Sequence, residues 1–165
     1  MTIARTARPV EGIDPVSNAQ PGREVAAVDH VRRNPEGLAP PNQFTHIVGA
    51  GDLYFLSGQV ARGADGWVVG PGDMAAQGRQ SFDNLSILLD ELALEWGDVV
   101  KLVIYVTDMS ALADVRRVRA EVFAAARCEP PAITTVGVTS LAAPDAMIEI
   151  EAIAVRRGRS GASGG

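Results

Sequence analysis

The sequence predicts an α+β domain in which two helices lie on one face of a mixed β-sheet. Two segments carry apolar residues at three- and four-residue steps, which is the spacing of an amphipathic helix. Around them lie short apolar runs of strand length, bounded by glycine, proline and aspartate. A chain of 165 residues with 47% apolar and 21% charged residues has the length and composition of a single globular domain.

The domain opens with strands. Residues 44–50 and 53–59 are short β-type runs, and the Gly51-Asp52 turn pair between them predicts a hairpin. Residues 67–69 form a candidate edge strand, bounded on both sides by turn residues.

Helical spacing begins after Asp73, which can cap the first helix, and we expect Gly97 to end that helix. The apolar positions that define it are Phe82, Leu85, Leu88, Leu89 and Leu92. A second amphipathic helix should end near Arg127. Its apolar positions are Leu112, Val115, Val118 and Val122.

The remaining strands surround the second helix. Residues 99–107 are apolar on both faces, as in a central strand that is covered on both sides, and residues 133–138 and 147–155 form two further strands. Both helices then lie on one side of the sheet, and we expect Ile148, Ile150 and Val103 to be apolar residues of the other, uncovered side. Such a face on a small domain predicts oligomerisation.

The termini differ from the domain, which we place at residues 44–157. Residues 1–43 are rich in proline, glycine and charge and predict an N-terminal arm, and residues 158–165 predict a flexible tail. No apolar run has the length of a membrane span and the first 20 residues do not resemble a secretory signal, so we expect no membrane contact and a cytoplasmic protein. Cys128 is the only cysteine, which excludes an intrachain disulfide and a thiolate zinc site. The net charge of −5 disfavours nucleic acid as a partner.

A pair of glutamates is the strongest chemical feature. Glu149 and Glu151 lie two residues apart in the last strand, so both project from the same face. Two neighbouring carboxylates raise each other's pKa, which suits one of them to general acid or base catalysis. The alternative is a solvated strand face, and the residue spacing does not decide between the two.

Other candidates are weaker. His46 can perform acid–base chemistry near neutral pH, although a lone histidine is more often a satisfied polar residue. Gly58, in the Ser57-Gly58-Gln59 sequence, permits close approach of a ligand to the backbone, and Thr134-Thr135 would oppose it only if the fold brings the strands together.

The whole pattern resembles the YjgF/RidA family of small trimeric proteins, also called endoribonuclease L-PSP. The resemblance spans roughly residues 34–157. The motifs that carry it are Leu56-Ser57-Gly58-Gln59, residues 77–84, residues 98–101, residues 105–108, Pro131-Ala132 and residues 148–155. It implies a chorismate-mutase-like fold, a homotrimer whose sheets form a central barrel, and clefts between subunits that hydrolyse enamines and imines to a keto acid and ammonia. No metal or organic cofactor is implied.

The resemblance also assigns residues. Glu149 matches the glutamate that positions or activates water, and Gly58 matches a glycine that offers backbone contacts. Phe44 replaces a tyrosine and Thr135 replaces a cysteine. Ile133 stands where the family has an arginine that holds the substrate carboxylate, which predicts a less anionic substrate. Arg116 could reach the cleft from the second helix, although a solvated helix face is the alternative.

These assignments lead to two hypotheses. The first is a deaminase, hydrolase or tautomerase that acts on a small imine or enamine at a subunit-interface cleft, with Glu149 and His46 as catalytic residues. The substrate-binding residues would be Phe44, Ser57, Gly58, Ile133, Thr134, Thr135 and Arg116. The second is a trimer without catalytic activity that binds a small metabolite or acts as a holdase. A ribonuclease activity is disfavoured by the acidic charge and by the absence of a histidine pair.

Overall fold

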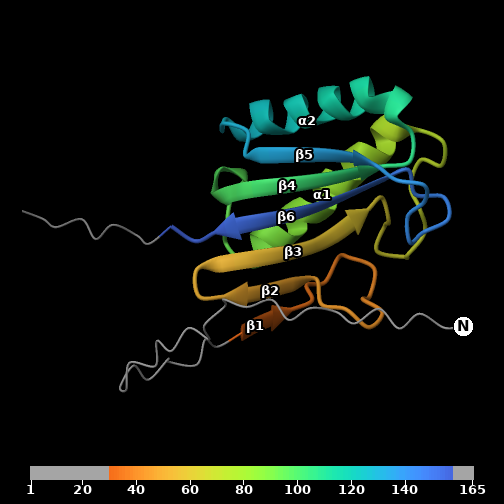
Figure 1. The fold of residues 1–165 in the computed structure, drawn as a ribbon. Coiled ribbons are helices and arrows are strands. Elements are labelled where there is room, and N and C mark those ends of the chain that lie inside the picture. The colour runs from red at the N-terminus through yellow and green to blue at the C-terminus, as the bar shows by residue number, and fades with distance from the viewer. Residues whose placement is uncertain (1–29, 158–165) are drawn as a thin grey trace, which may run out of the picture.

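A computed structural model describes residues 30–157, so the predicted tail and the first 29 residues of the predicted arm lie outside the described residues. The described part is one six-stranded mixed sheet with two helices (Figure 1). The strands are β1 (His30–Arg33), β2 (Ile47–Ala50), β3 (Leu53–Val60), β4 (Val99–Val106), β5 (Ala132–Gly137) and β6 (Ile148–Val155). The helices are α1 (Met74–Glu91) and α2 (Leu112–Ala126), and two 3-10 turns lie at Trp96–Asp98 and Met109–Ala111.

The order of the strands places the last strand in the middle of the sheet. The order is β1-β2-β3-β6-β4-β5, and all neighbouring pairs are antiparallel except β4 and β5, which are parallel and joined by α2. A parallel pair needs such a crossover, whereas β2 and β3 need only a tight turn. Since β6 pairs with β3 on one side and β4 on the other, its side chains are flanked by both strands.

Helix α1 begins as predicted and ends earlier than predicted. The Asp73 carboxylate accepts a hydrogen bond from the backbone N–H of Ala76 at 2.9 Å, which caps the helix. Leu92 is the C-cap, and Gly97 lies in the following 3-10 turn, so the predicted end at Gly97 is wrong. The chain leaves the helix through Ala93, whose φ is 51°, because this turn returns the buried Leu94 to the core.

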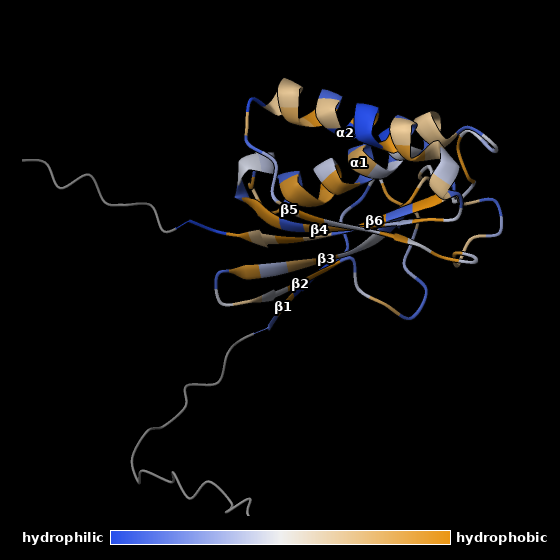
Figure 2. Ribbon diagram, turned by 45° about the horizontal axis from the view of Figure 1, so that its top comes forward, coloured by the Kyte–Doolittle hydropathy of each residue, from blue (hydrophilic) through white to orange (hydrophobic). Residues whose placement is uncertain are grey.

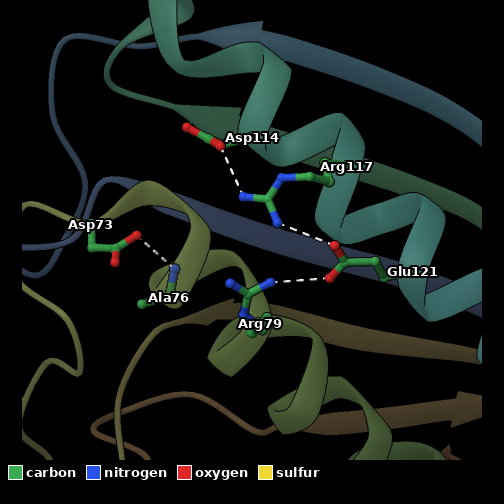
Figure 3. A network of polar contacts seen from close by, with 6 residues as sticks. All are labelled: Asp73, Ala76, Arg79, Asp114, Arg117 and Glu121. Carbon is green, nitrogen blue, oxygen red and sulfur yellow. Dashed lines mark hydrogen bonds and ion pairs between the residues drawn. The ribbon is translucent and has the colours of Figure 1, made fainter.

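Ion pairs on the surface link the two helices. Glu121 of α2 accepts hydrogen bonds from Arg79 of α1 at 3.0 Å and from Arg117 at 3.1 Å, and Arg117 also reaches Asp114 at 3.0 Å (Figure 3). All of these side chains are about half exposed, so each pair contributes at most about 1 kcal/mol. The packing of α1 and α2 therefore depends mainly on their apolar faces.

The two faces of the sheet have different surroundings. Both helices cover one face, and no described element covers the other (Figure 2). Ile148 and Ile150 are 0% exposed on the helix side, so their predicted place on the uncovered face is wrong. Alternation along β6 separates them from Glu149 and Glu151 but does not say which set meets the helices. Val103 does lie on the open face, where Phe55 is 46% and Leu53 is 42% exposed.

The sequence patterns missed one strand and overestimated another. Strand β1 lies inside the predicted arm and pairs with β2 from His30–Ala50 to Arg33–Ile47. All four of its residues are exposed, so no alternation marks it in the sequence. Residues 67–69 form only an isolated bridge, between Val68 and Arg62. None of the helices within residues 30–157 has the length and apolarity needed to cross a membrane.

Candidate functional site

Glu149 lies on the open face of the sheet beside a glycine. In the register, Glu149 is opposite Val60 of β3 and Tyr105 of β4. The pairing of β3 with β6 is irregular between Leu56 and Gln59, the stretch that contains Gly58. A Cβ atom at position 58 would lie 1.9 Å from Glu149 Oε1, so the carboxylate occupies the space that any other residue would fill. The structure thus gives Gly58 a close approach to Glu149, whereas the predicted approach of a ligand to its backbone stays a prediction.

The surroundings of Glu149 favour its neutral form. Burial raises the pKa of its carboxyl above the ordinary value, and the negative charge of Glu151 raises it further. Tyr105 lies on the same face, and the pKa of its phenol is raised by burial and by the charge of Glu151. A carboxyl group with a raised pKa in a partly dry setting can exchange protons with a bound ligand at moderate pH.

A hollow of about 300 Å³ opens at this carboxylate. Its volume is at the lower end for ligand sites, which suits a molecule of a few heavy atoms. The walls are mostly apolar with a few polar groups. They are formed by Phe44, Ser57, Gly58, Val60, Arg62, Ala142, Ala143 and Glu149.

His46 is buried next to this hollow without bordering it. It is 4% exposed, and its two ring nitrogens contact the Ala39 carbonyl at 3.1 Å and the Gln59 amide nitrogen at 3.3 Å. Because the Gln59 amide donates to Nδ1, the ring proton is assigned to Nε2, which donates to Ala39. His46 borders a second hollow of about 90 Å³, which shares Phe44 and Gly58 with the larger one.

The hydroxyl and the backbone N–H of Ser57 also form hydrogen bonds within the protein. Its hydroxyl donates to the Thr45 carbonyl at 2.6 Å, and its backbone N–H donates to the His46 carbonyl at 2.9 Å. These bonds hold the middle of β3 against the segment before β2. Ser57 therefore forms a wall of the larger hollow while its hydroxyl proton is already donated.

The other predicted binding residues do not border this hollow within one chain. Ile133 is partly buried against the core, and Thr135, two residues along β5, lies on the same side. Thr134 projects from the opposite side and accepts a hydrogen bond from Lys101. Arg116 is exposed on α2.

Sequence reasoning missed one residue that borders the hollow and one neighbour of Glu149 that does not. The neighbour is Tyr105, which lies opposite Glu149 in the β4–β6 register, and this register depends on a strand order that no local pattern reveals. Arg62 borders both hollows, although it follows β3 in an irregular segment without periodicity. The only sequence signal for Arg62 was its position four residues after Gly58, close to a residue already singled out.

Comparison with known proteins supports a common family. The family model described as endoribonuclease L-PSP matches residues 35–156. The 2-iminobutanoate/2-iminopropanoate deaminase of Escherichia coli K12 is 38% identical over 123 residues, which cover 74% of this chain and 92% of that protein. The crystal structure of the YjgF gene product from E. coli superposes with a TM-score of 0.68 at 36% identity, over 74% of this chain and 94% of that one.

A second solved structure shows the same fold at lower identity. E. coli TdcF with bound serine matches with a TM-score of 0.70 and 27% identity, over 77% of this chain and 98% of that one. The mixed six-stranded sheet with two helices agrees with these structures. The chain therefore belongs to the endoribonuclease L-PSP family, also called the YjgF/RidA family.

Proposed function

We propose that this protein is a deaminase that hydrolyses a small imine, or an enamine after tautomerisation, without a cofactor. The observation that carries the proposal is the Glu149 carboxyl, which lines a small, largely apolar hollow and has a raised pKa. The name of the E. coli relative, a 2-iminobutanoate/2-iminopropanoate deaminase, supports the same reaction class.

The chemistry requires one water molecule, and Glu149 carries a proton twice. In its ionised form Glu149 accepts a proton from water as the water oxygen forms a bond to the imine carbon, and it passes this proton to the imine nitrogen. The product is a carbinolamine that contains all atoms of the imine and of water. Glu149 then takes the proton of the carbinolamine hydroxyl and delivers it to the nitrogen as the C–N bond breaks, so a carbonyl compound and ammonia leave and Glu149 is ionised again. An enamine first accepts a proton at carbon to become the imine.

We further propose that three copies assemble through their open sheet faces into the barrel of a chorismate-mutase-like trimer. The exposed apolar residues of that face, among them Phe55 and Leu53, support this assembly. In the trimer, β5 of the neighbouring subunit, which carries Ile133, Thr134 and Thr135, would border the cleft, and strand alternation lets either Thr134 or the pair Ile133 and Thr135 face it. The cleft would lie between subunits, with Phe44, Ser57 and Gly58 on the side of Glu149.

His46 has a positioning role in this proposal. Its two ring nitrogens are engaged with Ala39 and Gln59, and its ring packs edge-on against Phe44 at 5.1 Å between centroids. These contacts suit a histidine that holds the wall of the cleft in place. Proton transfer to the substrate is assigned to Glu149 alone.

The test is ammonia release from imines generated in solution. Glu149→Gln should lower kcat by about 10²- to 10⁴-fold, the usual range for a general base. Asp83→Asn is the matched control, since Asp83 is exposed on α1 away from the hollow. Equal rates in the wild type and Glu149→Gln would exclude this mechanism. Ligand-induced thermal stabilisation without ammonia release would instead support the binding or holdase trimer.

A further inference from the structure

The guanidinium of Arg62 has no protein partner among residues 30–157. Its side chain forms no hydrogen bond or ion pair there, and its Nε is buried without a hydrogen-bond acceptor. Other arginines of the described chain, such as Arg33 and Arg117, pair with carboxylates. A buried donor of a cation that lacks an acceptor is costly, so it points to a group that binds there.

The backbone holds Arg62 at the junction of the two hollows. The Asn84 side-chain amide donates to the Arg62 carbonyl and to the Val60 carbonyl, both at 3.0 Å. Arg62 also forms the bridge with Val68. These contacts come from α1 and from the loop after β3, so the position of Arg62 does not depend on its own side chain.

Arg62 and Glu149 line the same hollow of about 300 Å³ without contacting each other. No pair of their charged atoms lies within 4.0 Å, since no ion pair joins them in the described residues. A cation and a proton-exchanging carboxyl therefore line one small cavity, with their charged atoms more than 4.0 Å apart. That arrangement suits a molecule with an anionic group at one end and a proton-accepting or proton-donating centre at the other.

We propose that Arg62 is the anion-binding residue of this cleft and holds a carboxylate of the ligand while Glu149 faces the carbon next to it. The planar guanidinium matches a carboxylate in shape and charge. The inference rests on the proposed function only in one respect, namely that the carbon facing Glu149 is the imine carbon. In this proposal the substrate is anionic, which differs from the expectation of a less anionic substrate drawn from Ile133. The cation is supplied by Arg62, after the end of β3, and not by β5 or by Arg116 of α2.

The probes for this site are pyruvate and its uncharged analogue pyruvamide, with binding measured by isothermal titration calorimetry on the full chain. Arg62→Gln should weaken pyruvate binding by about 10- to 100-fold, as expected for loss of a charged hydrogen-bond partner. The same variant should change the affinity for pyruvamide by no more than about twofold, because pyruvamide has no carboxylate that could pair with the Arg62 guanidinium. Arg79→Gln removes the same charge from the outer surface of α1 and should bind pyruvate like the wild type.

Arg62→Lys keeps the charge without the guanidinium fork, so it should bind pyruvate with an affinity between those of the wild type and Arg62→Gln. This variant also serves as the test if Arg62→Gln does not fold, as judged by circular dichroism. Equal pyruvate affinity in the wild type and the Arg62 variants overturns the inference, as does a wild type that does not bind pyruvate. Arg62-dependent pyruvate binding without ammonia release from any imine supports this site and refutes the proposed deaminase. Ammonia release that is unchanged in Arg62→Gln supports the proposed deaminase and refutes the Arg62 site.

Discussion

Gly58 and Glu149 share one space: a methyl group on Gly58 would lie 1.9 Å from the carboxylate oxygen Oε1 of Glu149. The two residues belong to neighbouring strands and are 91 positions apart in the sequence. Because the obstructed atoms are the end of a flexible side chain, the protein can fold with an alanine at position 58 only by moving the carboxylate. The position of the proposed catalytic group thus depends on the absence of a side chain opposite it.

Gly58→Ala should therefore separate catalysis from folding. We expect ammonia release to fall by about 10²-fold or more, since Glu149 leaves its position, while the free energy of unfolding falls by about 2 kcal/mol or less. Rates and urea denaturation measure the two effects. Gly78→Ala is the control: its new methyl group would lie 3.7 Å from Val118, and replacing a glycine inside α1 should stabilise the protein by about 0.5–1 kcal/mol. Full activity in Gly58→Ala would contradict the assignment of Glu149.

Glu151→Gln should move the acidic limb of the pH–rate profile. The limb reports the ionisation of Glu149, whose pKa is raised first by burial and second by the charge of Glu151. Removing that charge lowers the pKa of Glu149 part of the way toward its ordinary value, so the limb should shift to lower pH. The measurement is kcat/KM between pH 4 and pH 8, with Asp83→Asn as a control that keeps the wild-type limb. A limb that stays in place, or moves to higher pH, would show that Glu149 does not set it.

Glu149→Gln should gain stability relative to the wild type as the pH rises. Below the ordinary pKa of 4.5 the Glu149 carboxyl is protonated in both the folded and the unfolded chain, so it adds no pH dependence. Above that value the unfolded chain loses its proton first, because the folded pKa is raised, and the wild type becomes less stable until the folded pKa is passed. Glutamine carries no such penalty. Denaturation midpoints at pH 4 and pH 8 measure the change, and a difference that shrinks with pH would contradict the raised pKa.

A charge on the open sheet face should prevent assembly. Phe55 is paired in register with Val48 and Ile153 on that face, so Phe55→Lys places an ammonium group in the proposed interface. We expect sedimentation velocity to show a monomer, because burying an unpaired charge costs several kcal/mol. Trp67→Lys is the control, since Trp67 is 77% exposed and lies outside the sheet, and it should remain a trimer. A trimer in Phe55→Lys would place the interface elsewhere.

Asp73→Ala should test the cap of helix α1 independently of the site. The variant loses the hydrogen bond to the Ala76 N–H and should cost about 1 kcal/mol of unfolding free energy. Activity below the melting temperature should remain close to that of the wild type, because Asp73 does not border the hollow at Glu149. Unchanged stability, measured by urea denaturation, would show that solvent replaces the cap.

Local patterns predicted most elements of the fold because their periods are local properties. The apolar steps of α1 and α2 and the alternation of β6 need only the geometry of a helix and a strand. The same alternation predicted that Glu149 and Glu151 share a face. Strand β1 escaped detection because it is an exposed edge strand that is recognised only through its pairing with β2.

By itself, the sequence determined the two helices apart from the end of α1, five of the six strands, and the shared face of the two glutamates, because each follows from side chains a few residues apart. Only the tertiary structure decided that Ile148 and Ile150 meet the helices, that Gly58 lies against Glu149, and that Arg62 lines the same hollow. The physical reason is that β6 inserts between β3 and β4 through long-range hydrogen bonding. The alternation of side chains along a strand predicts which of them share a face, whereas the neighbouring strands and helices determine what that face contacts.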